Sequence, residues 1–293
     1  MAPAAMPEQA FTFDCEGSQL VAILHRPEDA ARAQKIGVVV VVGGPQYRVG
    51  SHRQFTLMAR AFCRAGYPVL RFDYRGIGDS EGVFRGFEQV DADIRAAIDA
   101  LLSAAPDLKG VILWGLCDAA SACLMFANRN DPRVAGLIIA NPWVRSEAGE
   151  ARAYLKHYYL QRLLQKSFWQ KVLGGAFNPV RAVRELAGLY SKAQTGEDAG
   201  GIGARSSHFI DRMYAGLDAS RFPVLLLISE VDLTAKEFLD HCERRPHWQA
   251  LLRKRQVREE RLPGVDHTFS TENGLPLVID RCLTWLGGPG QRA

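Results

Sequence analysis

The sequence predicts an α/β protein: a doubly wound, mostly parallel β-sheet covered by helices, with a helical insert after the sixth strand. First, short apolar runs alternate with segments of helical periodicity, as βαβ units require. Second, the run 36–42 is rich in valine and has no polar alternation, which is typical of a strand buried on both faces of a parallel sheet. Third, the alternation stops after Pro142 and resumes at Val224, so a segment without strands interrupts the pattern.

The first half of the chain supplies most of the expected sheet. Its turns are marked by glycine, which closes the first long helix at Gly66 and fills the loop after the fourth strand. The expected elements are a hairpin of strands 11–15 and 20–25, a strand 36–42, a helix 51–65, a strand 69–72, a glycine-rich loop 73–82, a helix 88–104, a strand 111–114, a helix 118–129 and a strand 134–140.

The second half contains the expected insert and the end of the sheet. We expect the chain to divide into three segments: the first part of the core at 1–143, a helical cap insert at 144–217 and the second part of the core at 218–293. The expected elements are helices 150–165, 167–173, 180–190 and 207–217 in the insert, and then a strand 224–229, a helix from about 235, a strand 257–262 and a helix 274–286.

The composition narrows the class of protein. The chain has 293 residues, of which 47% are apolar and 23% are charged, and this excludes collagen-like, disordered and disulfide-scaffold proteins. A net charge of +4 is too small to indicate a nucleic-acid partner. The longest apolar run spans 36–42, whereas a membrane-spanning helix needs about 20 such residues, so we expect no membrane segment.

The six cysteines and the first residues indicate a compartment. The cysteines are scattered without a CxxC pair or a Cys/His cluster at zinc spacing, so we expect reduced thiols, no metal site and no cofactor. The first ten residues lack the basic and apolar regions of a secretory signal. We therefore expect a cytoplasmic protein.

One segment carries the pattern of a nucleophile. Residues 111–121 read VILWGLCDAAS, in which a strand enters Gly115-Leu-Cys117-Asp-Ala119 and a helix starts at once. This is the form of a nucleophile elbow, with cysteine where serine usually stands. Small residues at 115 and 119 let strand and helix approach closely, and a helix N-terminus favours a thiolate. The alternative interpretation of Cys117 is a buried structural thiol. We interpret the other five cysteines in this way.

A thiol nucleophile needs a base, and the base needs an acid that orients it. Asp232 follows the expected strand 224–229, and His267 follows the expected strand 257–262. Catalytic groups in open α/β sheets gather beyond the carboxyl ends of the strands, so these two residues are expected to meet Cys117 there. Glu230 and Asp266 are neighbouring carboxylates that are more typical of turn or surface positions.

The oxyanion hole is expected at two backbone sites. One donor is the N–H of Asp118, directly after the nucleophile, and the other comes from the loop after Val42. Pro45 has no N–H, so the second donor is Gly44 or Gln46. His52 is a secondary candidate for lining the pocket, and the glycine-rich loop 73–80 is expected to brace the site without taking part in the chemistry.

Together, FDYRGIGDSEG, the Gly-x-Cys-x-Ala elbow and the late Asp and His resemble the α/β-hydrolase superfamily over nearly the whole chain. The segments GGPQYRVGSHRQF, GLCDAAS and SEVDLTAKEF resemble one branch, the exosortase A system-associated hydrolase 1 family. That resemblance implies a bacterial hydrolase encoded near exopolysaccharide and protein-sorting genes.

Two positions depart from the superfamily pattern. The usual His-Gly is Val42-Gly43, which leaves open what braces the oxyanion loop, and the usual serine is Cys117, as in dienelactone hydrolase.

The expected insert carries the positive charge of the chain. Residues 144–193 contain nine Lys or Arg and three Glu, a net charge of +6, together with seven aromatic residues. One interpretation is a lid helix whose apolar stripe packs on the sheet. The other is a cap whose basic rim attracts an anionic acyl carrier, a sugar acid or a membrane surface.

Three functions are compatible with these patterns. The first is a hydrolase that cleaves an ester, thioester or lactone through an acyl group on Cys117, with His267 as base and Asp232 orienting it. The second is an acyltransferase that uses the same intermediate. The third is a catalytically idle binding or scaffold module, because fold alone does not establish activity. The expected partner is a small-molecule acyl substrate, and the sequence does not predict the oligomeric state.

Overall fold

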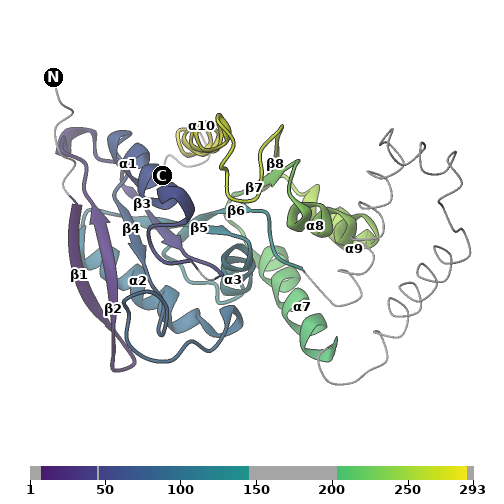
Figure 1. The fold of residues 1–293 in the computed structure, drawn as a ribbon, viewed down its shortest axis with the longest axis horizontal. Helices are drawn as coiled ribbons and strands as arrows, with labels where there is room; N and C mark the ends of the chain where they lie inside the picture. Colours follow the sequence, from purple (N-terminus) through teal and green to yellow (C-terminus); the bar gives the residue numbers. More distant parts are fainter. Residues whose placement is uncertain (1–7, 45, 145–202, 289–293) are drawn as a thin grey trace, which may run out of the picture. The chain divides into compact units, whose positions relative to one another are not determined.

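The computed structural model describes residues 8–44, 46–144 and 203–288 (Figure 1). Its centre is an eight-stranded sheet with the order β1-β2-β4-β3-β5-β6-β7-β8. The strands are β1 (Glu8–Cys15), β2 (Ser18–His25), β3 (Ile36–Val41), β4 (Val69–Phe72), β5 (Gly110–Leu116), β6 (Val134–Ala140), β7 (Val224–Ser229) and β8 (Val257–Leu262). The first two pairings, β1 with β2 and β2 with β4, are antiparallel, and all later ones are parallel. The predicted fold class is confirmed.

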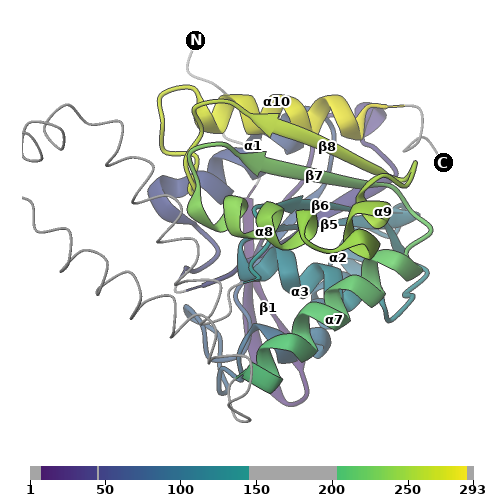
Figure 2. The ribbon, with the colours of Figure 1, turned by 90° about the vertical axis from the view of Figure 1, so that its right-hand side faces the viewer.

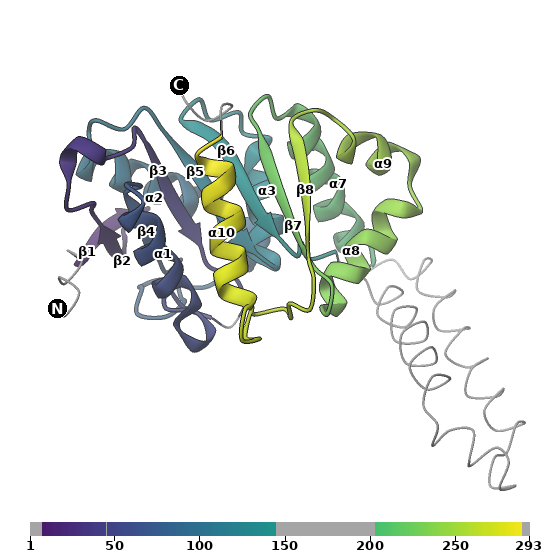
Figure 3. The same ribbon diagram turned by 90° about the horizontal axis from the view of Figure 1, so that it is seen from above.

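Helices cover both faces of this sheet. They are α1 (Gln54–Arg64), α2 (Asp91–Ala104), α3 (Asp118–Ala127), α7 (Gly203–Ala219), α8 (Leu233–Glu243), α9 (Pro246–Leu252) and α10 (Gly274–Leu286). Figures 2 and 3 show α1 and α10 on one face and α2, α3 and α7 on the other. Because strands β3 to β8 run parallel, their carboxyl ends lie at one edge of the sheet, where the loops to the following helices start.

The contacts divide the chain into two compact units. The first consists of Met1–Trp143 and Phe209–Ala293, and it contains the whole sheet. The second is Val144–His208. The predicted insert helices 150–165, 167–173 and 180–190 lie outside the described residues, whereas the predicted helix 207–217 falls within α7.

The sequence prediction differs from the structure at three helices. The predicted helix 88–104 starts at Asp91, because Phe87–Gln89 forms a separate 3-10 turn. The predicted helix 51–65 starts later than expected, because Ser51–Arg53 forms a separate 3-10 turn in which His52 and Arg53 have positive φ angles of 40° and 64°. The seven-residue helix α9 was not predicted, because a helix of two turns leaves too short an apolar pattern to recognise.

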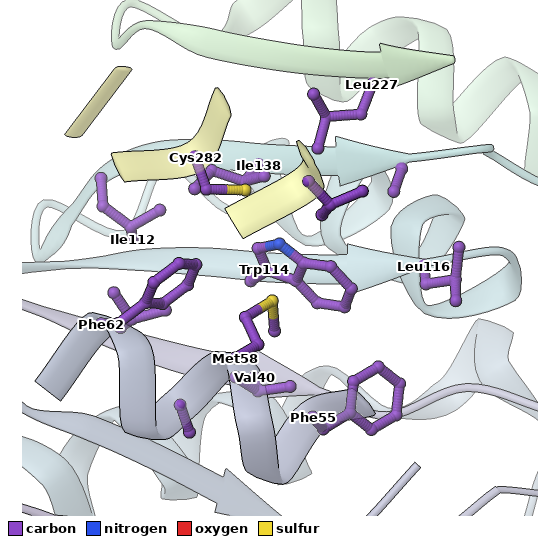
Figure 4. Packing of buried hydrophobic residues seen from close by; sticks show 14 of the residues in the cluster. Val40, Phe55, Met58, Phe62, Ile112, Trp114, Leu116, Ile138, Leu227 and Cys282 are labelled. Atoms are coloured by element: carbon purple, nitrogen blue, oxygen red, sulfur yellow. The ribbon is translucent and has the colours of Figure 1, made fainter. Parts of the chain in front are cut away.

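The core between the sheet and one helical layer fixes β5, the strand that leads to the elbow. All seven residues of β5 are buried, and its Trp114 is fully buried. Figure 4 shows the Trp114 ring between Met58 of α1 and Cys282 of α10. Phe55 meets the same ring edge to face, with centroids 5.6 Å apart. Apolar contacts from this helical layer thus hold the strand that leads to Cys117.

Within the described residues, no helix is long and apolar enough to cross a membrane. The same part of the chain contains no group of three or more His, Cys, Asp or Glu side chains that could hold a metal ion.

Candidate active site

Cys117 lies at the bend between β5 and α3. Its backbone has φ 63° and ψ −124°, a conformation that costs a non-glycine residue about 1–3 kcal/mol. The approach of strand and helix explains the small residues around it: a Cβ on Gly115 would lie 2.6 Å from the carbonyl oxygen of Ala119. Cys117 is partly exposed, whereas the other five cysteines are buried. The bend therefore leaves Cys117 more accessible than the other five cysteines.

Hydrogen bonds from neighbouring segments hold this strained residue. The Cys117 N–H donates to Ala140 O at 3.0 Å, and the Cys117 carbonyl accepts from the amides of Ser121 and Trp143, each at 3.2 Å. The Ser121 hydroxyl donates to Trp143 O at 2.7 Å. The elbow is thus fastened to the end of β6 as well as to its own helix.

Asp232 lies in the loop between β7 and α8 and caps that helix. Its carboxylate accepts from the amides of Thr234 at 3.0 Å and Ala235 at 3.2 Å. The residue is only 5% exposed. These contacts fix the carboxylate before any other group approaches it, which is what an orienting acid requires.

His267 follows β8 and is brought against this carboxylate. The distance from His267 Nδ1 to Asp232 Oδ2 is 2.8 Å. Burial acts to lower the pKa of His267, but hydrogen bonds with the Asp232 carboxylate and the Cys117 sulfur outweigh it and raise this pKa to about 10. The structure therefore brings Cys117, Asp232 and His267, which lie in three different loops, together around one imidazole ring.

His52 is joined to the same loop as His267. Its Nε2 lies 2.7 Å from the carbonyl oxygen of Thr268, the residue after His267. The backbone has a positive φ on both sides of this contact, at His52 (40°) and at Phe269 (61°). His52 therefore ties the turn before α1 to the histidine loop, a contact that its helix-start position in the sequence did not reveal.

Asp118 directs its carboxylate towards the loop after β3. Oδ2 accepts from the Gly44 N–H and Oδ1 accepts from the Ala119 N–H, both at 2.9 Å. Burial raises the pKa of Asp118, although the amides of Gly44, Ala119 and Asp118 itself act to lower it. Gly43 must lack a side chain here, because a Cβ on it would lie 2.0 Å from Asp118 Oδ1.

Gln46, the alternative oxyanion donor, is held by its side chain. Its Oε1 accepts from the Ser51 N–H and from Gln54 Nε2, both at 3.2 Å. Within the described residues, the Gln46 backbone N–H donates to no acceptor. The two sequence candidates thus differ: the Gly44 amide is engaged with Asp118, and the Gln46 amide has no acceptor in the described part of the chain.

A charged network braces the loop that carries Gln46. The Arg48 N–H donates to Asp73 Oδ1 at 2.6 Å, and the Arg48 guanidinium pairs with the Asp73 and Asp79 carboxylates. The buried Arg71 donates to the Arg48 carbonyl and, at 2.9 Å, to His25 Nε2. Because burial lowers the pKa of His25 to about 4, its ring is neutral and accepts this bond.

The remaining sequence candidates lie apart from this chemistry. The Asp266 carboxylate accepts from the amide and hydroxyl of Ser270, so it caps a turn as expected. Glu230 is exposed, and its backbone N–H donates to Leu262 O at 3.2 Å. Sequence reasoning missed the roles of Arg71 and of the Asp118 side chain. The signal for Arg71 was present, as a charged residue inside the buried strand 69–72.

The arrangement defines the class of protein. The mostly parallel eight-stranded sheet with helices on both faces has the architecture of the α/β-hydrolase fold, and Cys117, Asp232 and His267 follow β5, β7 and β8 in it. Residues 33–238 match the hydrolase family described as serine aminopeptidase, S33, and the chain belongs to this family.

Individual proteins are similar to this chain at sequence identities between 14% and 27%. The quorum-quenching protein AidA of Acinetobacter baumannii is 27% identical over 257 residues, which cover 80% of this chain and 83% of AidA. The Pyrococcus furiosus esterase Pf2001 matches with a TM-score of 0.62 at 14% identity, over 96% of this chain and 90% of its own. Est1E from Butyrivibrio proteoclasticus, with ferulic acid bound, matches with a TM-score of 0.61 at 14% identity, over 94% and 98%.

Proposed function

We propose that this protein hydrolyses an ester, thioester or lactone through a covalent acyl group on Cys117. The observation that carries the proposal is the 2.8 Å contact between His267 Nδ1 and Asp232 Oδ2, on a ring whose pKa the Cys117 sulfur also raises. A nucleophile, a base and an acid that orients the base are the three parts that acyl transfer requires.

In the first step, the Cys117 sulfur attacks the carbonyl carbon and the leaving group departs with a proton from His267. Asp232 holds the imidazole in one orientation throughout, because its carboxylate is itself fixed by two amides. In the second step, His267 takes a proton from water, which attacks the acyl group and releases Cys117. The raised pKa of His267 suits the first role, since the ring carries a proton at neutral pH.

The proposed oxyanion donors are the Asp118 N–H and one amide of the loop after β3. Gly44 and Gln46 both remain candidates for the second donor. The superfamily usually has a His-Gly pair before this loop, and this chain has Val42-Gly43 there, so no histidine can brace the loop. The Arg48–Asp73 pair supplies the bracing of that loop instead.

Exposed apolar side chains near these loops favour an apolar acyl group. Tyr47 follows β3, Phe84 follows β4, and Val231 and Leu233 flank Asp232; all four are at least 40% exposed. Since β3, β4 and β7 run parallel, their following loops share one edge of the sheet. The ferulic acid bound to Est1E is an acyl ligand of comparable character.

The resemblance to the exosortase A system-associated hydrolase 1 family extends the proposal to a substrate from exopolysaccharide or protein-sorting chemistry. In that setting, the basic segment 144–193 would attract an anionic carrier of the acyl group. This segment lies almost entirely outside the described residues. Acyl transfer to a hydroxyl or an amine is the second candidate, because it uses the same intermediate and differs only in the acceptor.

Steady-state turnover of activated aryl esters and thioesters tests the proposal. We expect turnover in water by the native protein, none by Cys117→Ala, and weak ester cleavage by Cys117→Ser, because His267 can still act as base. Full activity of Cys117→Ala would exclude this cysteine as the nucleophile. Turnover only with an added alcohol would favour the transferase, and an unreactive Cys117 would favour the idle module.

A further inference from the structure

Of the three backbone amides that are candidates for binding an oxyanion, those of Gly44 and Asp118 act on a carboxylate of the protein itself. The Gly44 N–H donates to Asp118 Oδ2 at 2.9 Å, and the amide of Asp118 acts on the same carboxylate. The Ala119 N–H completes the set at Oδ1, also at 2.9 Å. A carboxylate that accepts hydrogen bonds from backbone amides imitates the charge of an oxyanion.

The surroundings are shaped around this carboxylate. Gly43 leaves the space in which Asp118 Oδ1 lies, and any Cβ there would approach it to 2.0 Å. Asp118 is the residue directly after the nucleophile, so its side chain and the Cys117 sulfur start from adjacent positions of one bend. The contact is therefore part of the local fold and not a loose surface bond.

We propose that the Asp118 carboxylate is an internal ligand of the oxyanion hole, which the substrate carbonyl must displace before Cys117 can be acylated. This inference rests on the proposed function, because an oxyanion hole matters only if acyl transfer occurs. A negative charge at this position opposes the charge that develops on the carbonyl oxygen. Asp118 therefore restricts reaction to substrates that bind well enough to move it.

One buried hydroxyl that senses the charge of Asp118 has no hydrogen-bond partner of its own in the described part of the chain. The Tyr74 hydroxyl is buried and has no hydrogen-bond partner within the described residues. Burial, with the charge of Asp118 next in size, raises the pKa of Tyr74 well above its usual value, so the two groups are within electrostatic range. The other titratable groups that act on this pair are His267, Cys117, Cys123 and Asp93.

Two reactions of Cys117 separate this role from others. Acylation by an activated thioester such as phenyl thioacetate develops an oxyanion, whereas alkylation by iodoacetamide displaces iodide at a saturated carbon and develops none. We expect Asp118→Asn to raise the acylation rate tenfold or more and to leave the alkylation rate within threefold. The matched control is Glu230→Gln, which removes an exposed carboxylate near Asp232 and is expected to change neither rate.

Other outcomes overturn the inference in distinguishable ways. Slower or unchanged acylation in Asp118→Asn would mean that the carboxylate braces the hole or does not occupy it. A parallel rise of both rates would mean that Asp118 acts on the sulfur. If neither protein is acylated although both are alkylated at Cys117, the proposed function fails and this inference with it.

A measurement on the native protein covers the case in which the variant does not fold. The Gly44 amide proton should move in the NMR spectrum when Cys117 is acylated and stay in place when Cys117 is alkylated. An unmoved Gly44 resonance in the acylated protein would contradict the displacement.

Discussion

The Nδ1 atom of His267 lies 2.8 Å from Oδ2 of Asp232, a carboxylate that two amides of α8 hold in place. This contact, with the hydrogen bond to Cys117, raises the pKa of His267 to about 10 against the opposing effect of burial. It connects the last two loops of the sheet edge with the bend that carries the cysteine.

The protonation of His267 can be measured directly. In an NMR titration we expect His267 to keep its proton at pH 8, whereas His25 and His241, whose pKa values burial lowers to about 4, are neutral at pH 6. Cys117→Ala and Asp232→Asn should each lower the pKa of His267, because each removes a contact that raises it. An ordinary titration of His267 near 6.5 in the native protein would contradict the described contacts.

The same shift predicts how stability depends on pH. Because the folded protein binds the His267 proton more tightly than the unfolded chain does, its contribution to the free energy of unfolding is complete below pH 6.5 and disappears as pH rises through 10. The difference in unfolding free energy between native protein and His267→Ala should shrink across this range. Urea unfolding at several pH values measures it, and a difference that grows with pH would reverse the sign.

Gly115→Ala should disable the elbow. The added Cβ would lie 2.6 Å from Ala119 O, so strand and helix must separate and the Cys117 sulfur moves. A displacement of about 1 Å at a reacting atom can lower a rate roughly 100-fold. Turnover of an activated ester measures the effect. The control is Gly287→Ala at the end of α10, where the nearest atom is 3.4 Å away and no loss of rate is expected.

His52 should act as a positioning residue through Thr268. We expect His52→Ala to lower kcat about fivefold, which corresponds to the loss of one hydrogen bond of roughly 1 kcal/mol, and to leave KM nearly unchanged. His52→Gln retains a side-chain donor and should recover part of the rate. Equal losses in both variants would mean that the bond to the Thr268 carbonyl is not the cause.

Removing the buried guanidinium of Arg71 should destabilise the fold. Arg71→Met leaves His25 Nε2 and the Arg48 carbonyl without their donors, a loss of about 3 kcal/mol. Chemical unfolding measures this value. The comparison is Arg32→Met, whose exposed side chain pairs with Asp29 on the surface and should contribute less than about 0.5 kcal/mol. Similar effects of the two changes would show that the Arg71 network is not a support of the fold.

The sheet and the order of the candidate catalytic residues follow from sequence patterns that are local. Runs such as 36–42 are apolar because both faces of a parallel strand are buried, and the small residues at 115 and 119 are required by one close contact. The chain order of Cys117, Asp232 and His267 then places all three at one edge, since each follows a parallel strand.

The features that the sequence did not predict depend on contacts between distant segments. The left-handed conformation of His52 and Arg53 has no local cause in the sequence, and it becomes intelligible only with Thr268 on the opposite side of the contact. The Asp118 carboxylate had no predicted role, because its partner amide at Gly44 lies 74 positions away. Arg71 required knowledge of His25, which belongs to a neighbouring strand.

Peptide mapping of the protein after a brief reaction with phenyl thioacetate tests the central claim most directly. We predict a single acetyl group on Cys117 in the native protein and no acetyl group in Cys117→Ala. In His267→Gln we predict that the acetyl group accumulates, because its hydrolysis is slower than its formation. Turnover by the native protein with the acetyl group on another residue, or with the same labelling in Cys117→Ala, would contradict a cysteine nucleophile at the elbow.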